Sequence, residues 1–112
     1  MNTYNTIQSL LFSFEDNYHL PSLALVNNAQ LKGTHPALLE AIKQTEQAIT
    51  ALEHLQTVVT RLVERDGSTI TQEDAWRVSD DLAELLYSLL YLIAELGQLS
   101  IEIAEEYMVC GE

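Results

Sequence analysis

The chain has 112 residues, of which 47% are hydrophobic and 20% are charged, and its formal net charge is −12. With only four glycines and two prolines, this composition excludes a disordered or fibrous protein and fits one packed domain spanning residues 1–112. Its five basic residues stand against 17 acidic ones, too few to supply the clustered cations on which DNA or RNA binding depends. We therefore expect a single all-α domain that binds no nucleic acid directly.

The first part of the chain predicts two short helices. Over residues 3–17, apolar side chains recur at alternating steps of three and four, which is the period of one helix face. Pro21 suits the first turn of a helix, because its missing N–H would have no partner there, so a second helix is predicted over residues 21–31. The apolar face of the first helix comprises Tyr4, Ile7, Leu11, Phe14 and Tyr18.

A long one-sided helix is predicted over residues 36–65. It opens at Pro36 and carries an unbroken apolar stripe on one side, with charged and polar residues opposite. This pattern is typical of a helix that packs against a core along one face. Asp66 and Gly67 end the helix, because glycine readily takes the left-handed conformation that is common after the last turn.

The last predicted helix spans residues 71–108. The Thr71 hydroxyl can accept the N–H of Asp74, whose carboxylate reaches back in a capping-box arrangement. At 1.5 Å per residue this helix is about 55 Å long. Because only a short loop separates it from the helix over residues 36–65, the two are predicted to form a long antiparallel hairpin.

The apolar residues of this last helix form a heptad seam. Flanking positions widen the seam to an arc of about 200°, twice what one neighbouring helix covers. The longest stretch without a charge is ten residues, Leu85–Ala94, about half of what crossing a membrane requires. We therefore expect protein, and not lipid, around this helix. The seam comprises Val78, Leu82, Leu85, Leu89, Leu92, Leu96, Leu99 and Ile103.

The N-terminal helices are too short to cover so wide an apolar arc. The predicted fold is therefore a long antiparallel helical hairpin with one or two N-terminal helices packed on it, and a homodimer completes the helical bundle. The residues expected at the dimer interface are Leu82, Leu86, Leu89, Leu90, Ile93 and Leu96.

The acidic residues are concentrated toward the C-terminus, where residues 78–112 hold eight acids and no base. On the last helix most of them fall in a narrow stripe beside Tyr91, and a tyrosine among carboxylates suits the capture of a basic protein. Negative charge also speeds the encounter with such a partner, although a purely solubilising role is the alternative. The candidate partner-binding residues are Asp81, Glu84, Tyr91, Glu95, Glu102 and Glu105.

Sequence motifs that carry catalysis are absent. The chain has no glycine-rich phosphate loop, no paired cysteines and no histidine motif for zinc or di-iron. His19, His35 and His54 fall on different segments and are expected to be solvated. We therefore expect no metal, no cofactor and no enzymatic activity.

The expected location is the cytoplasm. The N-terminal segment lacks the basic stretch and the cleavage site of a signal peptide, and its apolar residues are spaced periodically instead of being clustered. Cys110 has no second cysteine with which to form a disulfide, which is compatible with a reducing compartment.

The function that the sequence favours is that of a small acidic interaction module, which binds a basic partner protein and regulates or inhibits it. Immunity proteins, antitoxins, secretion chaperones and inhibitors of nucleic-acid-binding machinery are proteins of this kind, and the sequence does not rank them. One alternative is a structural homodimer that works through its apolar surface. A less favoured one is an enzyme that uses carboxylate-bound Mg²⁺.

Overall fold

The structure is a computed structural model that describes residues 3–66 and 70–110. Every regular element within these residues is a helix and none is a strand, so the predicted all-α class is confirmed. In chain order the elements are α1 (Thr3–Phe14), the π-helical turn η1 (Glu15–His19), α2 (Leu20–Lys32), α3 (His35–Asp66) and α4 (Gln72–Cys110).

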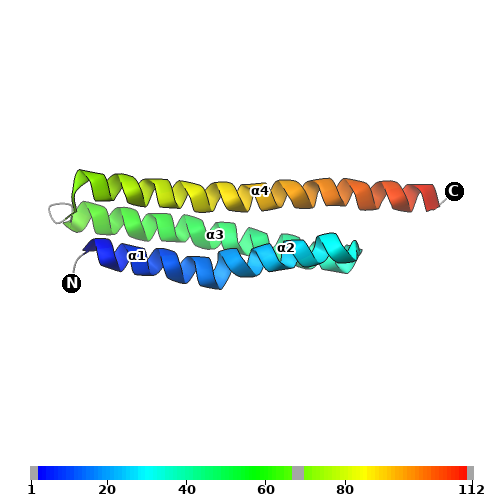
Figure 1. Cartoon of the computed structure of the whole chain (residues 1–112), viewed down its shortest axis with the longest axis horizontal. Coiled ribbons are helices and arrows are strands. Elements are labelled where there is room, and N and C mark those ends of the chain that lie inside the picture. Colours follow the sequence, from blue (N-terminus) through cyan, green and yellow to red (C-terminus); the bar gives the residue numbers. More distant parts are fainter. Residues whose placement is uncertain (1–2, 67–69, 111–112) are drawn as a thin grey trace.

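The helices pack as three rods that lie side by side (Figure 1). The first rod, by which we mean α1, η1 and α2 together, runs in the same direction as α4, and α3 runs the opposite way. The molecule measures 66 × 18 × 17 Å along its principal axes. The C-terminal part of α4 extends past the ends of α2 and α3 (Figure 1), so this part of α4 has fewer neighbours than the rest.

All three rods contribute side chains to one buried apolar cluster. Alternating steps of three and four bring one face of each helix to the shared interior, and full burial of a leucine or isoleucine side chain contributes roughly 1.5–3 kcal/mol. The buried apolar residues are Ile7, Leu11, Phe14, Val26, Ala29, Leu38, Ala41, Ala48, Leu52, Leu55, Val59, Val78, Leu89, Leu92 and Leu96.

The sequence predicted a break in the first rod between residues 17 and 21, but the rod is continuous there. The N–H of Leu20 donates to the carbonyl of Glu15, five residues back, which is the hydrogen bond of a π-helix. In a regular α-helix the ring of Pro21 would collide with the carbonyl four residues before it. The wider π turn accommodates the proline, which lies in the first turn of α2, and the helix continues through it.

The π turn also shifts the buried face of the first rod. Tyr18, which the sequence placed on the apolar face, is exposed, and its ring stacks on Phe14 with the centroids 5.3 Å apart. The buried face resumes at Ser22 and continues with Val26 and Ala29. The extra residue that a π turn inserts explains this change of phase.

Local interactions define the helix ends. Gly33 takes a left-handed conformation, with φ of 59°, and its N–H donates to the carbonyl of Ala29 at 2.8 Å, which ends α2. At the start of α4, the N–H of Asp74 donates to the Thr71 hydroxyl at 3.1 Å, which confirms the Thr71 half of the predicted capping box. Gly67, the predicted end of the preceding helix, lies outside the described residues.

The apolar surface of α4 is incompletely covered. By length and composition alone, its stretch Gln72–Glu106 could cross a membrane, and the core helix of a soluble protein passes the same test. Of the most apolar part of this stretch, 17% is buried inside the protein, and further apolar residues are half-buried against the core. Leu90 and Ile101 remain exposed.

A single chain already buries part of the predicted dimer interface. Leu89 and Leu96 are 0% and 1% exposed, because they fill the core of a single chain, and so they present no surface to a second copy. Leu90, one residue further along the helix than Leu89, is 46% exposed. The other predicted interface residues, which are half-buried at the edge of the core, are Leu82, Leu86 and Ile93.

We expect Ser22→Ala to stabilise the protein. Ser22 is fully buried, and its hydroxyl has no hydrogen-bond partner among the described residues, whereas the equally buried Thr45 donates to the carbonyl of Ala41 at 2.7 Å. An unpaired buried hydroxyl costs on the order of 1–3 kcal/mol. The free energy of unfolding, measured by urea denaturation, should therefore rise by about 1 kcal/mol.

Ser100→Ala is the matched control for this stability measurement. Ser100 is exposed on α4, so its replacement reports only the higher helix propensity of alanine. A gain for Ser22→Ala no larger than that of the control would show that the buried hydroxyl carries no penalty.

Candidate functional site

The candidate site is a groove between the first rod and α4. Two hollows of about 380 and 540 Å³ lie along it, and both are lined by His19 and Ser88. They therefore adjoin at these two residues, and we call the two hollows together the α4 groove. Grooves between packed helices are common places for a bound ligand or a partner helix.

Carboxylates from both walls line one half of the α4 groove, which we call the acidic half. Glu15 comes from the π turn, and Asp81 and Glu84 come from α4. The exposed ring of Phe12 lies beside them. No lysine or arginine is among the described residues that line either half. The acidic half therefore carries a negative potential that attracts cations.

Aromatic and aliphatic side chains line the other half, which we call the aromatic half. Leu23 comes from α2, and Tyr87, Tyr91 and Leu92 come from α4. Both tyrosines are exposed, and Leu23 is exposed as well. Exposed aromatic rings beside a hollow offer apolar contact area together with a hydroxyl group, so this half suits the apolar side chains of a bound polypeptide.

A hydrogen bond joins α2 to α4 beyond the aromatic half of the groove. The Gln30 side-chain amide donates to Glu95 Oε2 at 3.1 Å and so links α2 to α4. The Tyr91 hydroxyl also forms a hydrogen bond with the Glu95 carboxylate, and this bond, followed by the charge of Glu95 and by burial, raises the pKa of Tyr91. Glu95 thus joins both walls of the groove.

A cation lies near the acidic end of the groove. Arg77 forms a hydrogen bond with the side chain of Tyr4, which raises the pKa of the arginine, and the negative charge of Glu73 raises it further. The Arg77 guanidinium donates to Glu73 Oε1 at 2.9 Å. These contacts link α1 to the first turns of α4.

The predicted partner-binding residues fall into two groups in the structure. Asp81, Glu84 and Tyr91 line the α4 groove, and Glu95 lies beyond its aromatic half. Glu102 and Glu105 are instead exposed further along α4, where the Gln98 amide donates to Glu102 Oε1 at 3.4 Å. The groove therefore brings together the first group and leaves the second outside it.

Sequence reasoning missed the wall that the first rod contributes. Phe12, Glu15 and Leu23 line the groove, yet none belongs to the periodic apolar stripe. The signal that could have identified this wall is a large apolar residue off the stripe, Phe12, close to the only acids of the N-terminal third.

His19 differs from the expected solvated histidine. It is half-buried at the junction of the two halves, and its Nδ1 is buried without a hydrogen-bond partner among the described residues. Among those same residues no cluster of three or more histidine, cysteine or carboxylate side chains could hold a metal ion.

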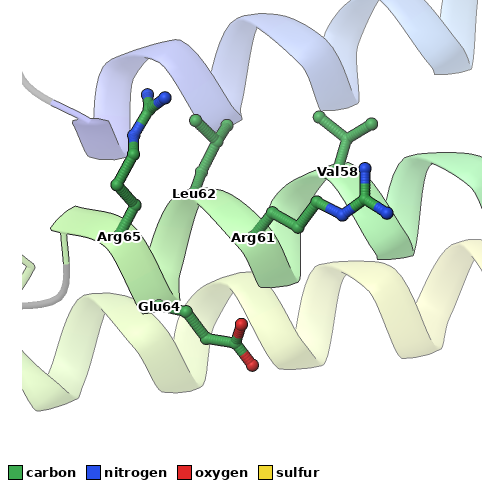
Figure 2. A pocket seen from close by; sticks show the side chains of 5 residues that line it. All are labelled: Val58, Arg61, Leu62, Glu64 and Arg65. Atoms are coloured by element: carbon green, nitrogen blue, oxygen red, sulfur yellow. The ribbon is translucent and has the colours of Figure 1, made fainter.

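A further hollow lies on α3, and all its described lining residues belong to that helix. They are Val58, Leu62, Glu64 and two arginines, Arg61 and Arg65. Figure 2 shows Val58, Leu62 and Arg65 pointing from α3 toward α1, with Glu64 pointing the other way. The arginines of the C-terminal turns of α3 thus lie outside the α4 groove.

No protein family, no curated protein and no solved structure matches the chain.

We expect Tyr91 to ionise above the ordinary tyrosine pKa of about 10. The Tyr91 hydroxyl donates a hydrogen bond to the Glu95 carboxylate, and the negative charge of Glu95 opposes formation of a second negative charge on Tyr91. Because the folded protein holds this proton more tightly, the contribution of the contact to stability is present below pH 10 and is lost as the pH rises through the raised value. Tyrosinate absorbance, compared between the wild type and Tyr91→Phe, measures this ionisation.

Glu95→Gln should lower the pKa of Tyr91 toward the ordinary value, because it removes the negative charge and keeps the shape of the side chain. Glu105→Gln, an exposed acid further along α4, is the control and should leave the titration unchanged. An unchanged titration in Glu95→Gln would contradict the contact.

Proposed function

We propose that the protein is a binding module without enzymatic activity, which captures a basic, amphipathic segment of a partner protein in the α4 groove. One observation supports this most strongly. Three carboxylates and two exposed tyrosines line the same groove, and no lysine or arginine is among its described lining residues. A segment that carries both cations and apolar side chains complements both halves.

The two halves contribute differently to such binding. An exposed ion pair contributes only about 0–1 kcal/mol, so the carboxylates mainly select a basic partner and speed the encounter. An apolar side chain that becomes fully buried contributes roughly 1.5–3 kcal/mol. We therefore infer that the aromatic half supplies most of the affinity and the acidic half most of the selectivity. Phe12, beside the carboxylates, can also contact a cation through its ring face.

Binding of this kind suits a cytoplasmic protein that regulates or inhibits a basic protein by covering part of its surface. Immunity proteins, antitoxins, secretion chaperones and inhibitors of nucleic-acid-binding machinery work in this way. The groove favours none of these over the others, since each would present a cationic surface to it.

The proposal predicts that the double substitution Asp81→Asn, Glu84→Gln weakens binding of a labelled amphipathic peptide of leucine and lysine. The substitution removes two charges from the acidic half without changing its shape. The dissociation constant, measured by fluorescence anisotropy at low salt, should rise about tenfold. This difference should shrink at high salt, because salt screens exposed charges.

The matched control is Glu46→Gln, Glu53→Gln, which removes two exposed carboxylates from α3 and changes the net charge equally. Its affinity for the peptide should stay within about twofold of the wild type. An equal loss in both double variants would show that binding follows net charge and not the groove, and would contradict the proposal.

A second candidate function is the predicted structural homodimer, which would complete the bundle around the antiparallel pair α3 and α4. Trp76, Leu90 and Ile101 are 67%, 46% and 55% exposed, and their spacings of 14 and 11 residues are close to whole helical turns. They therefore share one side of the helix, which we call the outer face of α4. Gly97 lies in open space, so its backbone can be approached closely.

If the outer face forms the homodimer, Leu90→Glu should yield a monomer of unchanged helicity. A glutamate would be buried without a partner in the interface, at a cost of several kcal/mol, whereas in the single chain it would be exposed. Multi-angle light scattering and circular dichroism measure the two properties. Leu39→Glu is the matched control, since Leu39 is 52% exposed on α3. A compact wild-type monomer at micromolar concentration would rule out the homodimer.

A further inference from the structure

The two halves of the α4 groove lie in a fixed order along both walls. On α4, Glu84 in the acidic half precedes Tyr91 in the aromatic half by seven residues, about 10 Å along the helix axis. On the first rod, Glu15 precedes Leu23 by eight residues, about 12 Å. Both walls therefore separate the charged contacts from the apolar contacts by about the same distance.

The two walls also run in the same direction. The first rod and α4 both run from the N-terminal end of the molecule toward the C-terminal end (Figure 1). A helix that lies between two parallel helices is best placed antiparallel to both, because opposed helix dipoles then lie side by side. This placement gives the up-and-down order of a four-helix bundle, so a bound helix would become a fourth rod.

The ends of the groove limit the bound segment. At the acidic end, Arg77 presents a cation held by Tyr4 and Glu73, which repels further basic residues. At the aromatic end, the hydrogen bond from Gln30 to Glu95 joins the two walls. Glu95 follows Arg77 by 18 positions in the sequence, which corresponds to about 27 Å along α4. A bound helix of that length has about five turns.

We propose that the occupant is a helical segment of about five turns that runs antiparallel to α4, with its apolar anchors in its N-terminal half and its arginines or lysines about seven residues later. This rests on the proposed function, and adds to it the order and the spacing of the partner's residues. In this orientation the partner's apolar side chains lie against Leu23, Tyr87 and Tyr91, and its cations reach Glu15, Asp81 and Glu84. The cations also lie near the C-terminal end of the bound helix, where they stabilise it.

The test uses two fluorescein-labelled helical peptides of identical composition. The first carries leucine and tryptophan in its N-terminal half and arginine seven residues later, and the second carries the same residues in reverse order. Circular dichroism first confirms that the two peptides are equally helical. Fluorescence anisotropy with the full chain should then give the first peptide an affinity at least about tenfold higher.

The outcomes separate this inference from the proposed function. Tight binding of the first peptide alone supports both. Equal binding of the two peptides, or tighter binding of the reversed one, overturns the inferred order while a basic segment still binds. Binding of neither peptide overturns the proposed function and the inference with it.

Glu84→Gln supplies a second readout of the register. The substitution should lower the affinity for the first peptide several-fold. It should have no further effect on the affinity when the peptide's arginines are replaced by glutamine, because the two changes remove the same contact. Additive losses would contradict the placement of the cations in the acidic half.

Discussion

The structure depends above all on the apolar surface of α4, which is wider than the first rod and α3 together can cover. Leu89 and Leu96 fill the core of the single chain, whereas Leu90 and Ile101 remain exposed on the outer face. Both proposed functions would place a further helix against this part of α4, one from a partner protein and the other from a second copy of the chain.

Pro21 influences the candidate site from outside it. Its ring does not fit a regular helix, and the π turn at Glu15–His19 accommodates it. That turn contributes Glu15 to the acidic half and His19 to the junction of the two halves. π turns occur frequently at functional sites, because the extra residue points side chains where a regular helix would not. Through this turn Pro21 thus shapes the wall of the groove that faces α4.

Features that depend on residues close together in the sequence could be predicted, and features that depend on neighbouring rods could not. The helical class follows from the periodicity of the apolar residues. The cap at Thr71 follows from a contact between residues only three apart in the sequence. Leu89 and Leu90 are both leucines, and only the positions of the other rods decide that the first is buried and the second exposed. The wall formed by Phe12 and Glu15 was missed for the same reason, since two rods distant in sequence create it.

The two candidate functions use neighbouring sides of α4, and Tyr87 lies where they meet. It lines the groove, and it stands 11 residues after Trp76 and 14 before Ile101, close to whole helical turns. Leu90 on the outer face and Tyr91 in the groove are consecutive residues, which a helix separates by about 100° around its axis. A homodimer formed through the outer face would therefore place the second copy beside Tyr87, at the edge of the aromatic half of each groove. Dimerisation and capture of a basic helix would then compete for this side chain.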